Sequence, residues 1–331
     1  MLTVDLSSEE TRPPVVFLMG PTAAGKTDLA IGLSDKSPID LISVDSALVY
    51  RGMDIGSAKP DREILKQYPH ALIDIRDPSE AYSAADFCED ALALIEKSHE
   101  SGRIPLLVGG TMLYFKALCD GLADMPPTNL ELRAQIEARA AEQGWPALYE
   151  ELRAVDPATA ARLHPNHSAR IERALQIYHA TGIPMSEYHM GQNESDFCCR
   201  FDLHQIGILP RQRETLHSRI ADRLEQMFQI GFVDEVGTLY TRGDLSPELP
   251  SIRAVGYRQL WSYFDSEISL EEAKLRALYA TRKLAKRQLT WMRSWVNLNL
   301  IYTQDDQGAT LCSDFIVDRC LKILDSNQSS N

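Results

Sequence analysis

The clearest chemical signal in the sequence is a phosphate-binding loop, Gly20-Pro21-Thr22-Ala23-Ala24-Gly25-Lys26-Thr27, which fits G-x-x-x-x-G-K-[ST] without a mismatch. An apolar run precedes it and a helical stretch follows it, which is the context that such a loop requires. Its glycines let the backbone wrap a phosphate, and the N–H groups that open the helix add positive potential. Lys26 is expected to contact phosphate oxygens, and Thr27 to offer its hydroxyl to Mg²⁺. The loop therefore predicts a phosphorylated ligand, without showing whether that ligand is ATP.

A second candidate group is Asp45, which ends the next apolar run. In enzymes that hydrolyse nucleoside triphosphates, an aspartate at this place holds Mg²⁺ through water, and a further residue orients the attacking water. No residue of the sequence stands out as that further group or as a sensor of a γ-phosphate. Hydrolysis is therefore not favoured as the main reaction.

The elements that must position these groups follow from apolar runs of strand length. Such runs at 15–19, 40–44, 71–75 and 104–108 predict buried strands, and the stretches 28–33 and 83–100 predict helices between them. A strand at 201–209 and helices at 211–240 and 270–295 are expected further along. Alternating strands and helices predict an α/β fold with a P-loop NTPase-like parallel sheet core flanked by helices.

The composition changes at 124–128, and from 129 to 189 the chain is rich in Ala, Glu and Arg without a convincing strand. This part predicts an all-helical insertion domain. The expected division is a first part of the core at 1–124, the insertion at 125–195, and a return to the core with basic C-terminal helices at 196–331.

The chain has 331 residues, a formal net charge of −13 and six cysteines without C-x-x-C spacing. No run reaches the roughly 18 apolar residues of a membrane helix, and residues 1–14 do not resemble a signal peptide. A cytoplasmic protein that does not bind nucleic acid indiscriminately is therefore expected.

One segment nevertheless has the opposite charge, because residues 251–300 hold nine Lys and Arg against four Asp and Glu. Six cations between 276 and 293 fall within about 140° of a helix circumference. Such a stripe suits a phosphate backbone, although an ordinary solvated helix face would look the same.

Several further clusters accompany the phosphate loop in a fixed order, at 44–60, 108–114, 156–157, 169–175, 252–258 and 282–291. With the loop they resemble the tRNA dimethylallyltransferase family (tRNA isopentenyltransferases, or IPP transferases) of the compact bacterial type, over roughly residues 15–300. The resemblance implies transfer of a dimethylallyl group from its diphosphate to the exocyclic amine of the adenosine just 3′ of the anticodon. A phosphate loop used without hydrolysis would then hold the diphosphate leaving group together with Mg²⁺.

The resemblance also implies residue roles. Asp45 is the general base toward the adenine amine, and Thr111 lies at the mouth of the channel near the same amine. Lys26 and Thr27 complete the catalytic set. Two alternatives stay open: Asp45 as a water-mediated Mg²⁺ ligand, and Thr111 as a helix cap.

The expected partners are dimethylallyl diphosphate and the tRNA anticodon stem-loop, which the insertion would clamp, with no membrane and the chain acting as a monomer. Position 48 is Leu where the family often has Gln, so a side-chain amide that could read a neighbouring base is missing. The rival functions are a small-molecule P-loop kinase and a non-catalytic RNA-binding protein. By likeness, the residues that contact tRNA are Asp45, Ser46, Ala47, Leu48, Thr111, Arg133, Ala169, Arg170, Ile171, Glu172, Arg173, Arg253, Ala254, Val255, Gly256, Tyr257, Arg258, Lys286, Arg287, Gln288, Leu289, Thr290, Trp291, Met292 and Arg293.

Overall fold

The computed structural model describes residues 12–190 and 195–328. Its contacts divide the chain into two compact units, Met1–Ala117 with Asp196–Asn331 (unit 1) and Leu118–Ser195 (unit 2). Most of the N-terminal segment in which no signal peptide is expected, residues 1–11, lies outside the described part.

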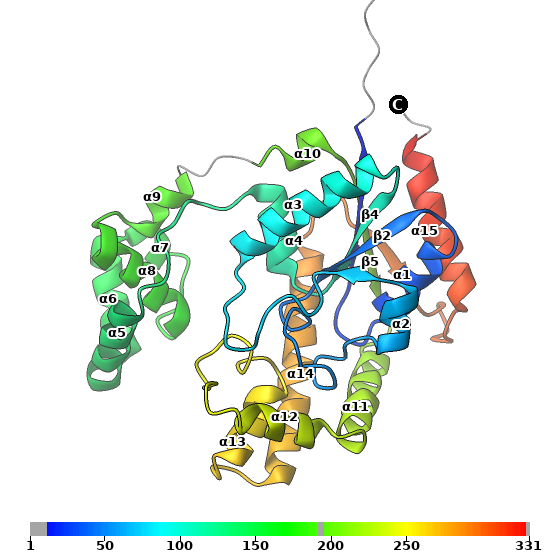
Figure 1. The fold of residues 1–331 in the computed structure, drawn as a ribbon. Helices are drawn as coiled ribbons and strands as arrows, with labels where there is room; N and C mark the ends of the chain where they lie inside the picture. The colour runs from blue at the N-terminus through cyan, green and yellow to red at the C-terminus, as the bar shows by residue number, and fades with distance from the viewer. Residues whose placement is uncertain (1–11, 191–194, 329–331) are drawn as a thin grey trace, which may run out of the picture. The chain divides into compact units, whose positions relative to one another are not determined.

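Unit 1 is built on a parallel six-stranded sheet with the order β3-β2-β4-β1-β5-β6 (Figure 1). The predicted fold class is confirmed. Parallel sheets are covered on both faces, which is why the strands are continuous apolar runs rather than alternating ones. In the central strand β1, Val15 through Met19 are at most 1% exposed. The strands are β1 (Pro14–Met19), β2 (Ile39–Val44), β3 (His70–Ala71), β4 (Ile104–Gly109), β5 (Asp202–Leu209) and β6 (Asn299–Tyr302).

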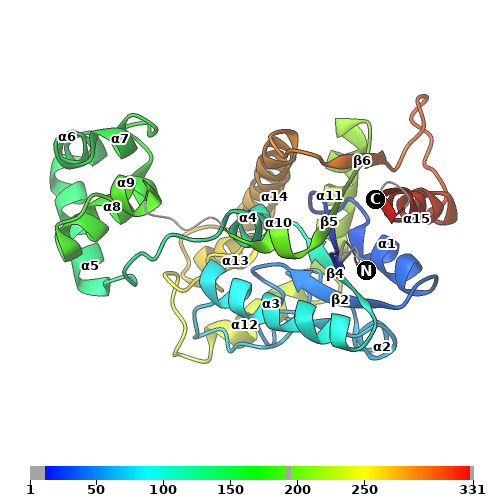
Figure 2. The same ribbon diagram turned by 90° about the horizontal axis from the view of Figure 1, so that it is seen from above.

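Helices cover both faces of this sheet. On one face, α1 (Lys26–Ser34) and α15 (Ser313–Gln328) lie side by side and share an apolar cluster with β1, β2, β4, β5 and β6 (Figure 1, Figure 2). On the other face, Phe17 of β1 contacts the rings of Phe115 and Phe197. The remaining helices of this unit are α2 (Arg62–Gln67), α3 (Ala84–Glu100), α10 (Phe197–Arg200), α11 (Arg213–Gln229), α12 (Phe232–Tyr240), α13 (Tyr257–Phe264) and α14 (Leu270–Arg293). Helix α4 (Met112–Asp120) begins in unit 1, and its last three residues belong to unit 2.

Some sequence expectations about these elements are wrong. The strand expected at 71–75 ends after Ala71, because Leu72 and Asp74 adopt left-handed backbone conformations with φ of 66° and 57°. There Asp74 accepts a hydrogen bond from the side chain of Lys59. The helix expected at 211–240 is two helices, separated at Gly231 with φ of 105°. Strand β6 had no counterpart in the sequence analysis.

Unit 2 consists of short helices, and within its described residues, 118–190 and 195, no strand occurs. The helices pack around a small apolar core that includes Ile136, Leu148, Leu152 and Leu175. Short capping turns separate them, as at Asp156, whose carboxylate accepts a hydrogen bond from the N–H of Thr159 at the start of α7. The helices are α5 (Leu130–Gln143), α6 (Trp145–Val155), α7 (Pro157–Ala160), α8 (Ser168–Thr181) and α9 (Met185–Met190).

Over the described ranges, none of the helices has the length and apolar character needed to span a lipid bilayer. Within the same ranges, no three His, Cys, Asp or Glu side chains gather into a group that could hold a metal ion.

Candidate active site

The phosphate loop connects β1 to α1 as the sequence predicts. Gly20 is required by close approach, since a Cβ there would lie 2.7 Å from the carbonyl oxygen of Ile208 on β5. Gly25 is required by its backbone, because its φ of 89° is in the left-handed region. The loop therefore leads the chain directly into α1, whose first N–H groups have no partner within the helix and can bind an anion.

Lys26 is the first residue of α1, and its Nζ donates a hydrogen bond to the carbonyl of Pro21, 2.9 Å away, across the loop. Burial lowers the pKa of Lys26 to about 8; the charge of Asp45 opposes this shift and that of Arg223 adds to it. A cation whose charged form is so weakly supported gains much from an anionic ligand. Lys26 thus gives the loop a positive charge that a bound phosphate would neutralise.

Asp45 and Thr111 follow the carboxyl ends of two neighbouring parallel strands, β2 and β4, which are in register at Val44 and Gly109. The structure brings their loops together. The N–H of Thr111 donates to the carbonyl of Val44, and its Oγ1 accepts a hydrogen bond from the N–H of Ser46, both at 3.2 Å. The two residues that the sequence analysis placed at the adenine amine therefore share one edge of the sheet.

The carboxylate of Asp45 is held by its own loop. Its Oδ1 accepts hydrogen bonds from the N–H groups of Ala47 and Leu48, at 2.8 and 3.3 Å. Burial raises the pKa of Asp45, against the opposing effects of the Ala47 N–H and the charge of Lys26. Within the described chain, Oδ2 takes part in neither of these bonds and can accept one from another group. The result is a fixed carboxylate of increased basicity.

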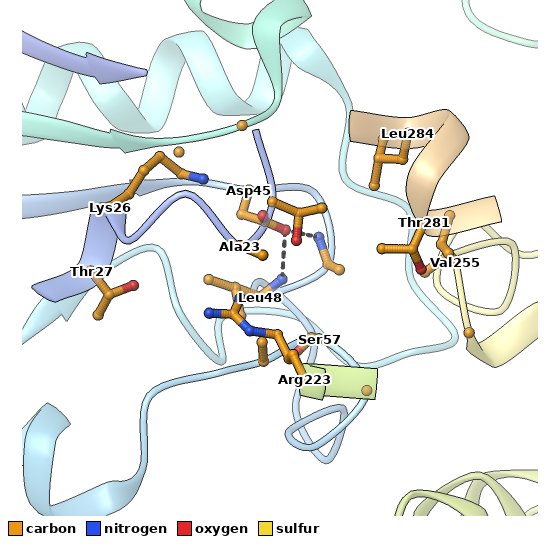
Figure 3. A pocket seen from close by; sticks show the side chains of 18 of the residues that line it. Ala23, Lys26, Thr27, Asp45, Leu48, Ser57, Arg223, Val255, Thr281 and Leu284 are labelled. Carbon is orange, nitrogen blue, oxygen red and sulfur yellow. Dashed lines mark hydrogen bonds between the residues drawn. The ribbon is translucent and has the colours of Figure 1, made fainter. Parts of the chain in front are cut away.

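A cavity of about 230 Å³ is lined by the phosphate loop and Asp45, whereas Thr111 is not among the residues that line it. Figure 3 shows Lys26 and Thr27 on one side of it, Val255 and Leu284 on the other, and Asp45 between them. The cavity thus offers cations and N–H groups at one end and an apolar wall at the other. The other apolar residues that line the cavity are Leu48, Ile73, Ile220, Leu224, Met227 and Phe232.

Arg223 of α11 also lines the cavity, and the sequence analysis did not single it out (Figure 3). Burial lowers the pKa of Arg223, while the charge of Asp28 opposes this shift. The available signal was its spacing, since it lies near the buried residues Leu216, Ile220 and Leu224 around the helix circumference, although Arg223 itself is exposed. An arginine on an apolar stripe indicates either a buried ion pair or an anionic ligand.

A second residue missed in the sequence analysis, Glu235 of α12, holds the loop that closes the cavity. Its carboxylate accepts hydrogen bonds of 2.7–3.0 Å from the N–H groups of Asp54, Ile55 and Gly56 and from the hydroxyl of Tyr257. A Cβ on Gly56 would lie 2.0 Å from the ring of Phe232. This loop therefore packs against α12 and α13 with no space for a larger residue.

Comparison of the sequence with known protein families identifies the family of this chain. Residues 48–295 match the profile of the family described as IPP transferase. The chain belongs to the IPP transferase family. A curated relative, tRNA dimethylallyltransferase 2 of Hahella chejuensis, is 54% identical over 313 residues, which cover 91% of this chain and 94% of the relative. The expectation of an enzyme, and of this family, is confirmed.

Similar solved structures support the same family assignment. The tRNA isopentenylpyrophosphate transferase of Bacillus halodurans is 36% identical with a TM-score of 0.68, covering 96% of this chain and 99% of that one. The Staphylococcus epidermidis enzyme is 30% identical with a TM-score of 0.67, covering 96% and 100%. A eukaryotic dimethylallyltransferase acting on tRNA is 25% identical with a TM-score of 0.76, covering 95% of this chain and 80% of that one.

The remaining positions expected to contact tRNA differ in exposure within this IPP transferase. Arg253, which precedes α13, and Arg258 in its first turn are exposed, whereas Ala254, Val255, Gly256 and Tyr257 line the cavity. On α14, Lys286, Arg287, Thr290 and Arg293 are exposed, Leu289 and Trp291 are half-buried, and Gln288 and Met292 are buried.

The cationic stripe expected along α14 is less uniform than the sequence indicates. Arg276, at one end, donates to Glu272 at 2.6 Å. The Nε of Arg282 is buried and has no hydrogen-bond partner among the described residues. The exposed cations in the second half of the helix are Lys283, Lys286, Arg287 and Arg293.

In unit 2, Ala169 and Arg170 are exposed on α8, whereas Ile171 and Glu172 are buried. Arg173 donates to the side chain of Gln176 and the carbonyl of Pro126, both at 2.6 Å. Arg133 of α5 lies 3.0 Å from Glu137 and 3.9 Å from Glu172. Whether these residues contact tRNA stays a prediction.

Proposed function

We propose that this IPP transferase moves the dimethylallyl group of dimethylallyl diphosphate to the exocyclic amine of the adenosine 3′-adjacent to the anticodon in tRNA, giving isopentenyladenosine and diphosphate. The observation that carries the proposal is the cavity in which the phosphate loop, a fixed aspartate and an apolar wall meet. The names of the similar enzymes, all tRNA prenyl or isopentenyl transferases, support it.

The cations of the cavity suit a diphosphate that leaves with increasing negative charge. Lys26 and Arg223, together with the N–H groups at the start of α1, would hold the diphosphate oxygens. Groups fixed in place before the reaction stabilise the developing charge without reorganising. The apolar residues opposite them would take the five-carbon prenyl chain and exclude water.

The site also fits Mg²⁺. This ion commonly keeps several waters and binds through one or two protein oxygens plus phosphate oxygens. The hydroxyl of Thr27 supplies one such oxygen, and the carboxylate of Asp45 lines the same cavity. Thr27 would hold the ion together with the phosphate oxygens, and the bound ion would add positive charge beside the diphosphate.

Asp45 would act on the amine. The allylic C–O bond breaks and its electron pair leaves with the diphosphate, while the amine nitrogen forms the new bond to carbon and loses a proton to the Asp45 carboxylate. The adenine amine is a poor nucleophile because its lone pair is delocalised into the ring. A carboxylate whose pKa is raised by burial is a better proton acceptor for it.

The base must leave the anticodon-loop stack to reach this cavity, as in other enzymes that act on a base. We propose that unit 2 clamps the anticodon stem-loop, and that the exposed cations of α14 bind its phosphates. Limited proteolysis with and without tRNA tests the clamp. Unchanged cleavage between residues 124 and 189 would contradict it.

Mass spectrometry of tRNA nucleosides after incubation with enzyme, Mg²⁺ and dimethylallyl diphosphate tests the reaction. Isopentenyladenosine is expected with the wild type and a loss of at least about 100-fold in rate with Asp45→Asn. The variant should still bind tRNA in a filter-binding assay. Phosphoryl transfer from ATP without prenyl transfer would refute the proposal and favour a kinase.

A further inference from the structure

The side chain of Gln288, on α14, joins two loops of the active site. It is 8% exposed, and both ends of its amide are used. Its Oε1 accepts a hydrogen bond from the N–H of Thr22 in the phosphate loop, and its Nε2 donates to the carbonyl of Gly110 after β4, each at 2.9 Å. The sequence resemblance had placed Gln288 among the residues that contact tRNA.

The close approach of this amide to the backbone depends on a glycine at position 110. A Cβ on Gly110 would lie 2.3 Å from Nε2 of Gln288 and 3.2 Å from the carbonyl oxygen of Gly20. Glycine at position 110 is therefore what allows the amide to reach both loops. Because a buried donor or acceptor without a partner is costly, a side chain lacking either end would leave one loop unsatisfied.

The connection continues to the residues proposed to act on the amine. Thr111 follows Gly110 directly, and its Oγ1 accepts the N–H of Ser46 beside Asp45. Gln288 thus connects the loop that would hold the diphosphate to the loops that carry Asp45 and Thr111, through successive hydrogen bonds and the backbone between Gly110 and Thr111.

The exposed side of the same helix carries the cations. Lys286 and Arg287 immediately precede Gln288, are exposed, and form no ion pair with any residue that the structure describes. One rigid helix therefore directs positive charge outward and an amide inward to the two loops.

We infer that Gln288 is a positioning residue, which fixes the phosphate loop relative to Asp45 and Thr111 and ties both to the helix that would bear the tRNA. This inference rests on the proposed prenyl transfer. The diphosphate and the amine are held by different loops, so their separation depends on what joins those loops. A misplacement of about 1 Å can cost about 100-fold in rate.

The test compares two variants that keep the size of the side chain. Gln288→Met removes both hydrogen bonds, and Gln288→Glu keeps the acceptor for Thr22 but sets a carboxylate against the carbonyl of Gly110. In steady-state prenylation assays both should lower kcat by about 10- to 100-fold. The KM for tRNA should stay within about twofold. If Gln288→Met shows no cooperative thermal unfolding and is therefore not folded, the kcat of Gln288→Glu tests the inference instead.

Two controls on the same helix separate the possible results. Arg287→Ala should raise the KM for tRNA with kcat nearly unchanged, which is the opposite pattern. Leu275→Gln, at an exposed position, should match the wild type. A wild-type kcat in a folded Gln288 variant would overturn the inference, as would a raised KM for tRNA alone, which would indicate direct contact with RNA. If wild type and Leu275→Gln form no prenylated tRNA, the proposed function itself fails.

Discussion

Raising the pH should weaken the use of dimethylallyl diphosphate through Lys26. Burial lowers the pKa of this lysine to about 8, so about nine tenths of it is protonated at pH 7 and about one tenth at pH 9. Only the protonated form offers a charged hydrogen bond to the diphosphate. If that form alone binds productively, kcat/KM for the diphosphate falls about tenfold for each pH unit above 8.

The sign of this effect follows from the direction of the shift. An ordinary lysine, with a pKa near 10.4, would stay charged to pH 9 and give no loss in this range. Burial has the largest influence on the pKa of Lys26; the charge of Asp45 opposes the lowering of this pKa, and the charge of Arg223 adds to it. The alkaline loss therefore reports how strongly burial in the cavity disfavours the charged form of Lys26.

The assay measures kcat/KM for dimethylallyl diphosphate from pH 6.5 to 9.5 at saturating tRNA and constant ionic strength. Lys26→Arg provides the comparison, because a guanidinium stays charged throughout this range. The variant should be less active but should lose the alkaline decline. A wild-type profile that is flat to pH 9.5 would refute the reasoning, and so would the same decline in Lys26→Arg, since another group would then be titrating.

Three further changes test two structural hydrogen-bond networks and the proposed tRNA-binding face of α14. Glu235→Gln should lower the free energy of unfolding by about 1–3 kcal/mol. Both carboxylate oxygens of Glu235 accept backbone hydrogen bonds, and the variant replaces one of these oxygens by an NH₂ group, which can only donate. An unchanged urea midpoint would contradict this. Asp156→Ala should cost about 1–3 kcal/mol in urea unfolding, because its carboxylate accepts from Thr159 and Ser186. Burial raises the pKa of Asp156, but these bonds outweigh it and the net pKa is lowered. The contribution should therefore be present above pH 4 and disappear as the pH falls below the usual carboxyl value, and a wild-type Tm in the variant at pH 7 would count against the cap. Replacing Lys286 and Arg287 together by Ala should reduce the dependence of log K for tRNA on log salt by about 1.4–1.8; an identical salt slope would remove α14 from the interface.

Much of the site could be predicted from the sequence because its signals are local. The phosphate loop is eight consecutive residues whose glycines, lysine and threonine have one chemical interpretation in a strand-to-helix turn. Asp45 follows an apolar run of strand length. In a parallel sheet, the carboxyl ends of the strands meet at one edge, so its place beside the loop follows from the fold class.

Local patterns were insufficient where distant segments decide the backbone. The run 71–75 has the apolar character of a strand, yet Leu72 and Asp74 are left-handed and the strand stops after Ala71. Lys59, fifteen residues earlier, holds the side chain of Asp74 there. Strand β6 has only one buried residue, Ile301, so it lacks the apolar run that identifies the central strands.

The sequence by itself determined the phosphate loop, the parallel sheet and the aspartate at its edge, because each is indicated by a pattern of residues that are neighbours in the chain. Only the tertiary structure decided the roles of Arg223, Glu235 and Gln288. Gln288 is separated from Thr22 by 266 positions, and the direction in which its amide points depends on how α14 packs. A polar residue on a helix therefore indicates its chemistry, but only packing decides whether it faces solvent or the active site.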